Sequence, residues 1–272
     1  MNELTNPFIV FGYAGPKYFC DRENETNELI SALRNGRNIT LRSPRRVGKT
    51  GLIQHVFATL AQANPEIKCF YVDLFSTHSL DEMVVELGKA VIGQLDTPLQ
   101  KMEGYVAQFF QSCRLYLSPD PLTGAPKLGL DLITANPAVT LEEIFTYIRK
   151  SEYTCYIAID EFQQIGEFAD SLTVQKRMRS VWQHQQHVNY CLFGSKKHLM
   201  QNMFLKSSYP FYKFGDIIPL EPIKEDLWIP YLQQGFRSWD KELPEAIARQ
   251  ICASVQLHPS YVQQLAWLTL LN

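Results

Sequence analysis

Two short groups of residues in this sequence have the types and spacing for phosphate chemistry. The first group is the segment Ser43, Pro44, Arg45, Arg46, Val47, Gly48, Lys49, Thr50 and Gly51. It follows an apolar run at residues 39–41 and precedes a stretch with helical periodicity. A strand, a loop and a helix in this order let backbone N–H groups surround a polyphosphate. The spacing predicts that Lys49 reaches the β- and γ-phosphates and that the Thr50 hydroxyl ligates Mg²⁺.

Ser43 departs from the usual phosphate-loop pattern, G-x-x-x-x-G-K-[ST], because it stands at the first glycine. A small residue can still make the turn, so we expect the loop to form. The alternative is an ordinary basic turn that caps a helix. Gly48, Lys49 and Thr50 after a strand-like run favour the phosphate site.

The second group is a pair of acids at the end of an apolar run, residues 155–162. Such a run is typical of a strand buried in a parallel sheet, and ligands bind at the carboxyl edge of such sheets. We expect Asp160 to hold the Mg²⁺ shell that Thr50 begins, and Glu161 to polarise the water that attacks the γ-phosphate. The alternative is a turn at the strand end with solvated carboxylates.

Ser195 follows a third apolar run, residues 189–194. We expect this strand between the loop strand and the acid strand. There the Ser195 hydroxyl could hydrogen-bond the γ-phosphate or the attacking water. The alternative is that Ser195 caps the next helix, which would contain Lys196 and Lys197.

The elements that must position these residues follow from periodicity and turn signals. Strands are predicted at 39–41, 68–75, 155–162, 189–194 and 214–222, and helices at 49–62, 79–114, 140–150 and 172–186. Residues 117–137 are interpreted as a loop insertion with one short strand. Five strands separated by helices define an α/β fold with a mostly parallel sheet. From residue 224 onward the pattern is helical only.

Composition limits the function classes. The 272 residues are 46% hydrophobic, and the formal net charge of −2 gives no global attraction to nucleic acid or anionic lipid. No apolar run reaches the length of a membrane span, and the N-terminus lacks the pattern of a signal peptide. We therefore expect a cytoplasmic protein without a membrane partner. The six scattered cysteines are predicted to be reduced thiols.

With these residues placed, the sequence resembles the archaeal-type ATPase group within the signal-transducing (STAND) branch of AAA+ P-loop ATPases. Residues 19–25 resemble the h-h-G-R-x-x-E motif of that branch, with Asp21 at the glycine. Residues 43–50 resemble its G-P-R-R-x-G-K-T loop, and residues 157–163 its I-D-E-F-Q strand end. Residues 257–259 resemble the G-x-P turn of its helical domain, although the residues before Pro259 depart from the usual glycine pair.

The resemblance implies a P-loop NTPase core at residues 1–222 and a small all-helical lid domain at 223–272. It implies ATP or ADP with Mg²⁺ as cofactors, held by the loop residues named above. Arg22 would lie against the adenine or ribose, and Pro259 would contact the nucleotide from the lid. Relatives usually continue into a winged-helix domain, so we expect the natural chain to extend past Asn272.

Relatives also place an arginine just before the last strand, where it completes the site of a neighbouring subunit. The matching segment here offers Lys213 instead. An ammonium cannot reproduce the planar bidentate fork of an arginine. The resemblance therefore implies good nucleotide binding with slow turnover.

The leading hypothesis is a P-loop ATPase that uses slow, Mg-dependent ATP hydrolysis as a conformational switch, with an unknown protein partner or a homo-oligomer. One alternative is a non-hydrolysing nucleotide-binding scaffold. Another is a DNA-associated initiator or loader, in which a basic cluster contacts nucleic acid. That cluster comprises Arg34, Arg37, Arg42, Arg45 and Arg46. The net acidity makes nucleic acid the less favoured partner.

Overall fold

The computed structural model describes residues 6–10, 12–92, 94–95, 111–119, 126–133, 136–151 and 153–272. Its central sheet has five strands in the order β2-β5-β6-β1-β7, and every pairing in it is parallel. The strands are β1 (Ile39–Arg42), β2 (Ile67–Asp73), β5 (Thr154–Asp160), β6 (Val188–Phe193) and β7 (Asp216–Pro219). This order places β6 between the loop strand β1 and the acid strand β5. The predicted parallel α/β core is confirmed.

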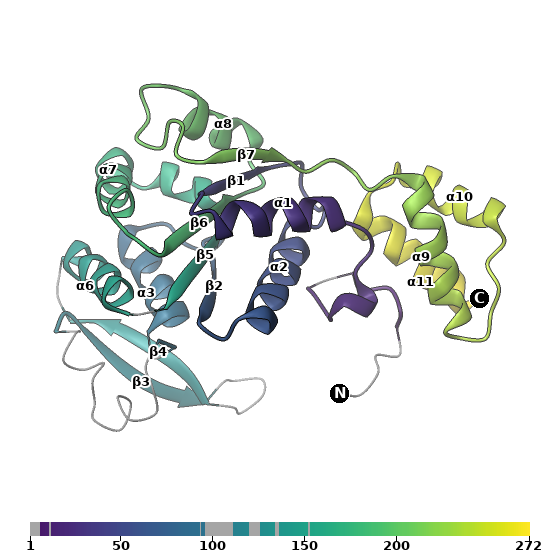
Figure 1. Cartoon of the computed structure of the whole chain (residues 1–272), viewed down its shortest axis with the longest axis horizontal. Helices are drawn as coiled ribbons and strands as arrows, with labels where there is room; N and C mark the ends of the chain where they lie inside the picture. Colours follow the sequence, from purple (N-terminus) through teal and green to yellow (C-terminus); the bar gives the residue numbers. More distant parts are fainter. Residues whose placement is uncertain are drawn as a thin grey trace.

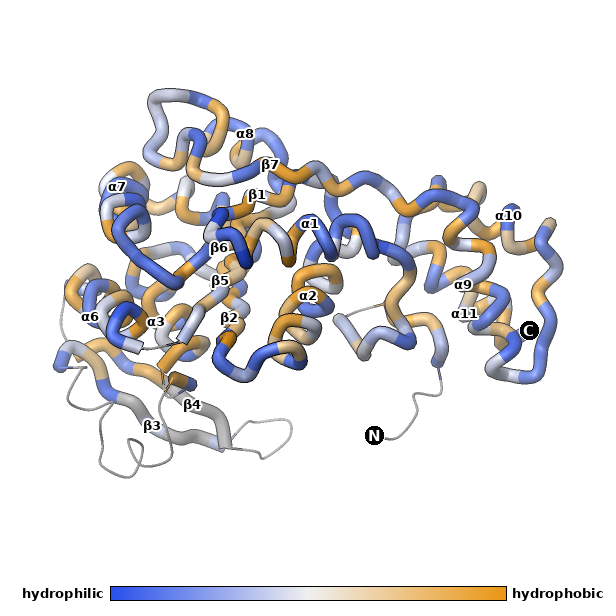
Figure 2. Tube along the Cα trace, viewed as in Figure 1, coloured by the Kyte–Doolittle hydropathy of each residue, from blue (hydrophilic) through white to orange (hydrophobic). Residues whose placement is uncertain are grey.

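Helices cover both faces of the sheet because its strands are apolar on both sides (Figure 1). Along β5, Tyr156 and Ala158 pack toward one face, while Ile157 and Ile159 pack toward the other. The first face is covered by α1 (Glu23–Arg34) and α2 (Lys49–Ala63). The second is covered by α3 (Leu80–Val91), α6 (Pro137–Lys150), α7 (Ser171–Trp182), η2 (Phe162–Glu167) and α8 (Lys197–Leu205). Figure 2 shows the hydrophobic residues along the buried strands.

The insertion before α6 contains an antiparallel hairpin, β3 (Cys113–Pro119) and β4 (Pro126–Leu132). The prediction of a helix through residue 114 is wrong at its end, since β3 begins at Cys113. The predicted loop insertion contains two paired strands instead of one. The hairpin packs beside α3, where a Cβ added to Gly88 would lie 2.5 Å from the Cδ1 atom of Leu130. The part of the expected helix at residues 96–110 lies outside the described residues.

Three helices end the chain and share an apolar cluster of their own: α9 (Glu225–Arg237), α10 (Glu245–Ser254) and α11 (Pro259–Leu271). They lie beside the sheet and are reached by the segment that leaves β7 (Figure 1). The N-terminal segment joins this cluster, because the Phe8 ring is fully buried against Tyr231 and Phe236, with ring centroids 6.1 and 5.9 Å apart. The short helix η1 (Pro16–Tyr18) follows in that segment.

All six cysteines are free thiols, and five of them are buried. Within the part of the chain that the structure describes, no helix is long and apolar enough to cross a membrane.

Candidate functional site

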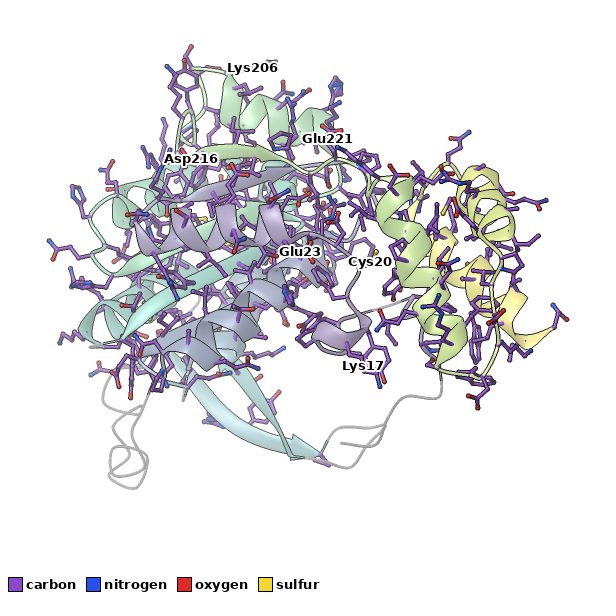
Figure 3. The ribbon with its side chains drawn as sticks, turned by 45° about the vertical axis from the view of Figure 1, so that its right-hand side comes forward. Lys17, Cys20, Glu23, Lys206, Asp216 and Glu221 are labelled. Carbon is purple, nitrogen blue, oxygen red and sulfur yellow. The ribbon has the colours of Figure 1, made fainter. Side chains whose placement is uncertain are left out.

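A cavity of about 570 Å³ lies where the phosphate loop meets the carboxyl ends of β5 and β6. The N-terminal segment and the first turns of α9 and α11 form its other walls. The cavity brings together most of the residues singled out from the sequence. These are Arg22, Arg45, Arg46, Val47, Gly48, Lys49, Thr50, Gly51, Asp160, Glu161, Ser195 and Pro259. Cys20 and Glu23 mark the junction of the N-terminal segment with α1 in Figure 3.

The loop turns into α2 through Gly48, whose φ of 90° lies in the left-handed region that favours glycine. Arg46 also has a positive φ, 59°. The helix begins at Lys49, so its first turn, with unpaired backbone N–H groups, faces the loop. This is the strand, loop and helix that the sequence predicted.

Lys49 is 7% exposed, and its ammonium is held by the loop itself. Its Nζ atom donates to the Ser43 Oγ atom at 3.2 Å and to the Pro44 carbonyl oxygen at 2.8 Å. Burial lowers the pKa of Lys49, while the nearby Asp160 and Glu161 act to raise it. Ser43 and Pro44 do not line the cavity, so they act on the site through Lys49. Ser43 thus supplies a contact that the glycine of the usual pattern lacks.

Asp160 is the centre of the metal-binding prediction. Its Oδ2 atom accepts hydrogen bonds from the Thr50 Oγ1 atom at 3.0 Å and from the Tyr71 hydroxyl at 2.7 Å. Its Oδ1 atom accepts from the Glu161 backbone N–H at 2.8 Å. Burial raises the pKa of the Asp160 carboxyl, and these hydrogen bonds oppose that effect. Thr50 and Asp160 are therefore adjacent, as the sequence predicted.

Sequence reasoning missed Tyr71. In the parallel register of β2 and β5, Tyr71 is opposite Ala158, and Val72 and Asp73 are opposite Ile159 and Asp160. Tyr71 and Asp160 therefore share a face of the sheet only once the two strands are paired. The alternation of each strand places Tyr71 on one face of β2 and Asp160 on one face of β5. Only the register of the two strands shows that these faces are the same side of the sheet.

Glu161 follows β5 directly and has a left-handed backbone, with φ 51° and ψ 38°. Its Oε2 atom accepts hydrogen bonds from the Ser195 hydroxyl at 2.9 Å and from the Ser195 N–H at 3.3 Å. The side-chain amide of Gln163 donates to the same oxygen. The Arg45 Nε–H group donates to the Ser195 Oγ atom at 3.1 Å. Ser195 thus connects the phosphate loop to the Glu161 carboxylate.

Ser195 does not cap the following helix. The N-cap of α8 is Lys196, and the helix begins at Lys197. The sequence left two roles open for Ser195. Its hydrogen bond to Glu161 fits a role in the site and not that of a helix cap.

Arg22 lies behind the phosphate loop and is almost fully buried. Its guanidinium pairs with the Glu25 carboxylate at 2.5 Å and donates to the Val47 carbonyl oxygen at 3.3 Å. Arg22 and Asp21 have positive φ values of 82° and 56°, which explains why the related motif has a glycine at the Asp21 position. Arg22 also lines the cavity, and its contact with adenine or ribose stays a prediction.

The phosphate loop contacts the C-terminal helices directly. Arg46 donates to the Tyr261 hydroxyl at 2.8 Å, and its guanidinium carbon lies 5.8 Å from the centre of that ring. Tyr261 is in the first turn of α11, which begins at Pro259. A movement of α11 relative to the sheet would therefore change a contact of the loop.

Aromatic residues of the N-terminal segment form the opposite wall. Tyr13 and Phe19 line the cavity, and His55 of α2 stacks on Phe19 with ring centroids 4.5 Å apart. The Tyr13 hydroxyl and the His55 Nδ1 atom are 2.7 Å apart. The sequence analysis did not assign Tyr13 or His55 to the site.

With this geometry established, comparison with known proteins decides the family. Residues 19–251 match a family described as an ATPase domain predominantly from Archaea. The chain belongs to this family. No curated protein matches this chain in sequence.

Solved archaeal structures share the fold of the domain. The Walker-type ATPase PABY2304 of Pyrococcus abyssi has a TM-score of 0.68 at 17% sequence identity, over 98% of this chain and 72% of that chain. The ORC1 protein of Aeropyrum pernix, solved in complex with DNA, has a TM-score of 0.62 at 13% identity, over 96% and 63% of the two chains. This chain thus spans roughly two thirds of their length, and the likeness shows the fold alone.

Lys213 has no place in this cavity. It is exposed in the segment before β7, where its backbone N–H donates to the Phe204 carbonyl oxygen. The expectation that Lys213 cannot replace the arginine of a neighbouring subunit's site stays a prediction.

The side chains present in the site fit a nucleotide polyphosphate and a divalent cation. Lys49 is a buried cation whose hydrogen bonds go to two neutral oxygens, so an anion would satisfy its charge. Thr50 and Asp160 offer a hydroxyl and a carboxylate oxygen within 3.0 Å, which are the hard ligands that Mg²⁺ prefers. The donor set is that of a P-loop ATPase.

Proposed function

We propose that this P-loop ATPase domain binds ATP with Mg²⁺ and hydrolyses it slowly, and that hydrolysis drives a conformational switch of the STAND type. The observation that carries the proposal is the contact chain at the cavity. Arg45 contacts Ser195, Ser195 contacts Glu161, and Thr50 contacts Asp160. Phosphate-binding, metal-binding and water-polarising groups thus meet at one edge of the sheet.

Each residue then has a defined task. Lys49 and the loop N–H groups bind the phosphates, and Thr50 and Asp160 hold the cation. A bound Mg²⁺ supplies neutralisation of charge on the phosphate oxygens. Glu161 accepts a proton from the attacking water, and Ser195 and Arg45 orient that water. Phosphoryl transfer depends mainly on such positioning and charge stabilisation.

The contact between the loop and α11 supports the switch. Arg46 lies in the phosphate loop and contacts Tyr261 of α11. Hydrolysis changes the negative charge of the bound phosphates near Arg46. Because Arg46 contacts Tyr261, this change reaches the C-terminal helices. These helices, residues 223–272, act as the lid in this proposal, and residues 1–222 act as the nucleotide-binding domain.

A protein, rather than DNA, is the partner that we propose for the switch. Three members of the basic cluster considered in the sequence have partners within the chain: Arg37 pairs with Asp216, Arg45 with Ser195 and Arg46 with Tyr261. Their charge is therefore partly engaged in the fold, and the net charge of the chain is −2. We expect no binding to duplex DNA at physiological salt, and an affinity for DNA that falls steeply with salt concentration would support the DNA-associated alternative.

Phosphate release from Mg-ATP over a range of protein concentrations tests the proposed ATPase. Lys49→Ala is expected to abolish nucleotide binding, and Glu161→Gln is expected to bind nucleotide and release little phosphate. Turnover per molecule that rises with protein concentration would indicate a site completed by a neighbour. Nucleotide binding without phosphate release in the wild type would contradict the ATPase and favour the scaffold function.

A further inference from the structure

Gln163 is a fully buried amide that the sequence analysis did not assign to the site. It follows Glu161 by two residues, in the first turn of η2. Its Nε2 group donates to the Glu161 Oε2 atom. A buried side-chain amide loses its hydrogen bonds to water, so this single contact with a carboxylate is central to its placement.

Gly194 provides the space that Gln163 occupies. A Cβ atom added to Gly194 would lie 1.7 Å from the Gln163 Oε1 atom and 2.9 Å from its Cδ atom. Gly194 has no positive φ, so its backbone conformation does not require glycine. The close approach of the Gln163 amide accounts for the absence of a side chain at this position. Gly194 also directly precedes Ser195, the other residue that contacts Glu161.

The donors around Glu161 all use the same oxygen. The Ser195 hydroxyl, the Ser195 N–H and the Gln163 amide each donate to Oε2. Among the residues that the structure describes, no hydrogen bond to the Glu161 Oε1 atom is found. The left-handed backbone at Glu161 is unfavourable for a residue with a side chain, so its conformation depends on these surroundings.

We propose that Gln163 is a positioning residue. Gln163 holds one oxygen of the Glu161 carboxylate, so that the other oxygen is directed to the attacking water. Glycine is required at position 194 to leave room for the Gln163 side chain. This inference rests on the proposed ATPase function, because orientation of Glu161 has a consequence for rate only if Glu161 polarises water.

Gln163→Met is the first variant, because methionine has a similar length and no strong donor. We expect kcat for ATP hydrolysis to fall roughly 10- to 100-fold, which is less than or equal to the smallest contribution of about 10²-fold that a general base usually makes, because Glu161 itself remains. The KM for ATP and the affinity for a non-hydrolysable ATP analogue should stay within about twofold, since Gln163 does not contact the phosphate loop.

Gly194→Ala tests the same contact from the segment that follows β6. Its methyl group would displace the Gln163 amide, so kcat should fall as it does in Gln163→Met. In a Gln163→Ala background the shortened side chain leaves room, and Gly194→Ala should then lower kcat no further. Two independent effects would instead multiply, and that result would overturn the inference.

Gln175 is the matched control. It is also a fully buried glutamine, and its Nε2 group donates to the Ser171 Oγ atom at 2.9 Å, on α7 away from the cavity. Gln175→Met should lower the thermal midpoint of unfolding about as much as Gln163→Met and leave kcat unchanged. An equal fall in kcat for both variants would mean that Gln163 has only a structural role.

A crystal structure of the nucleotide-free Gln163→Met protein gives a readout that does not need turnover. The Glu161 carboxylate is expected beyond hydrogen-bonding distance of the Ser195 Oγ atom. An unmoved Glu161 would overturn the inference even if the wild type hydrolyses no ATP. Conversely, an active wild type, an inactive Glu161→Gln and an unchanged kcat for Gln163→Met would overturn the inference and leave the proposed function intact.

Discussion

At the scale of single residues, the site is a set of short polar contacts that join three strand ends and one loop. Lys49 contacts Ser43 and Pro44, and Thr50 and Tyr71 both contact Asp160. These contacts hold the charged groups in place before any ligand arrives. A preorganised site of this kind needs little rearrangement when charge develops in the reaction.

The raised pKa of Asp160 gives a pH prediction. A carboxyl whose pKa is higher in the folded state than its usual value of about 3.9 binds protons more readily in the folded protein. The stabilisation that this carboxyl contributes to the folded state is fully present at a pH below its usual pKa. It is lost as the pH rises through the raised pKa of the folded protein. We therefore expect the free energy of unfolding of the nucleotide-free wild type, measured relative to Asp160→Asn, to fall as pH increases from about 3 to 7.

Urea unfolding at several pH values measures this difference, and the subtraction removes any constant effect of the asparagine. A wild-type advantage that grows with pH would contradict the predicted sign.

The residues to which we assign the proposed chemistry could be recognised from the sequence because their spacing along the chain is characteristic of phosphate loops and metal-binding strand ends. Lys49 and Thr50 are consecutive, and Asp160 and Glu161 end one apolar run. Tyr71 and Gln163 could not be recognised in this way. Their contacts depend on strand register and on the direction of a side chain in the folded protein, which no local pattern encodes.

At the scale of elements, α11 and the phosphate loop form a direct contact across the cavity. The contact consists of Arg46 and Tyr261, and Pro259 and Gln263 of α11 line the same cavity. We expect a bound non-hydrolysable ATP analogue to protect residues 240–265 from hydrogen exchange, because nucleotide contacts would restrain α10 and α11.

Hydrogen exchange followed by mass spectrometry measures this protection. Tyr261→Ala should reduce the protection of residues 240–265 while α2 remains protected, since Lys49 and Thr50 are unchanged. Equal exchange of residues 240–265 with and without nucleotide would contradict the role of these helices as a lid.

The N-terminal segment is an element of the C-terminal core, as Phe8 shows. Phe8 is fully buried among residues of α9, and a Cβ on Gly235 would lie 2.5 Å from its ring. We expect Phe8→Ala to lower the free energy of unfolding of the C-terminal helices by about 3–5 kcal/mol, the usual range for a buried phenylalanine.

Denaturant unfolding followed by tryptophan fluorescence reports on these helices in a Trp182→Phe background, where Trp228, Trp239 and Trp267 are the tryptophans that remain. Phe75→Ala provides the comparison, because Phe75 is 69% exposed, and it should change the unfolding free energy by less than about 0.5 kcal/mol. Equal effects of the two substitutions would contradict the packing assigned to the N-terminal segment.

Element boundaries were less predictable than the presence of elements. The predicted helix at 140–150 begins at Pro137, because Asn136 accepts a hydrogen bond from the Ala138 N–H and acts as the N-cap. Residues 140–143, Thr-Leu-Glu-Glu, resemble a capping box, but they lie inside the helix. The hairpin β3–β4 was missed because proline and glycine interrupt its alternation and its pairing joins two separate segments.

At the scale of the whole molecule, the chain has a sheet with cores on both faces and a helical part with its own core. The cavity lies where these parts meet. The α/β class followed from apolar runs that alternate with helices, and the expected place of β6 between β1 and β5 is confirmed. The packing of Phe8 and Cys20 against α9 did not follow, because a segment rich in proline, glycine and aromatic residues has no periodicity that indicates its partner.

We propose that this site cleaves ATP with Glu161 as the water-polarising group. Single-turnover cleavage of bound ATP by the wild type and by Glu161→Gln, at equal nucleotide occupancy and with Mg²⁺ present, tests it most directly. We expect the wild type to cleave ATP roughly 10²- to 10⁴-fold faster than Glu161→Gln, with equal ATP affinity. Equal cleavage rates in the two proteins, or bound ATP that stays intact in both, would contradict the account.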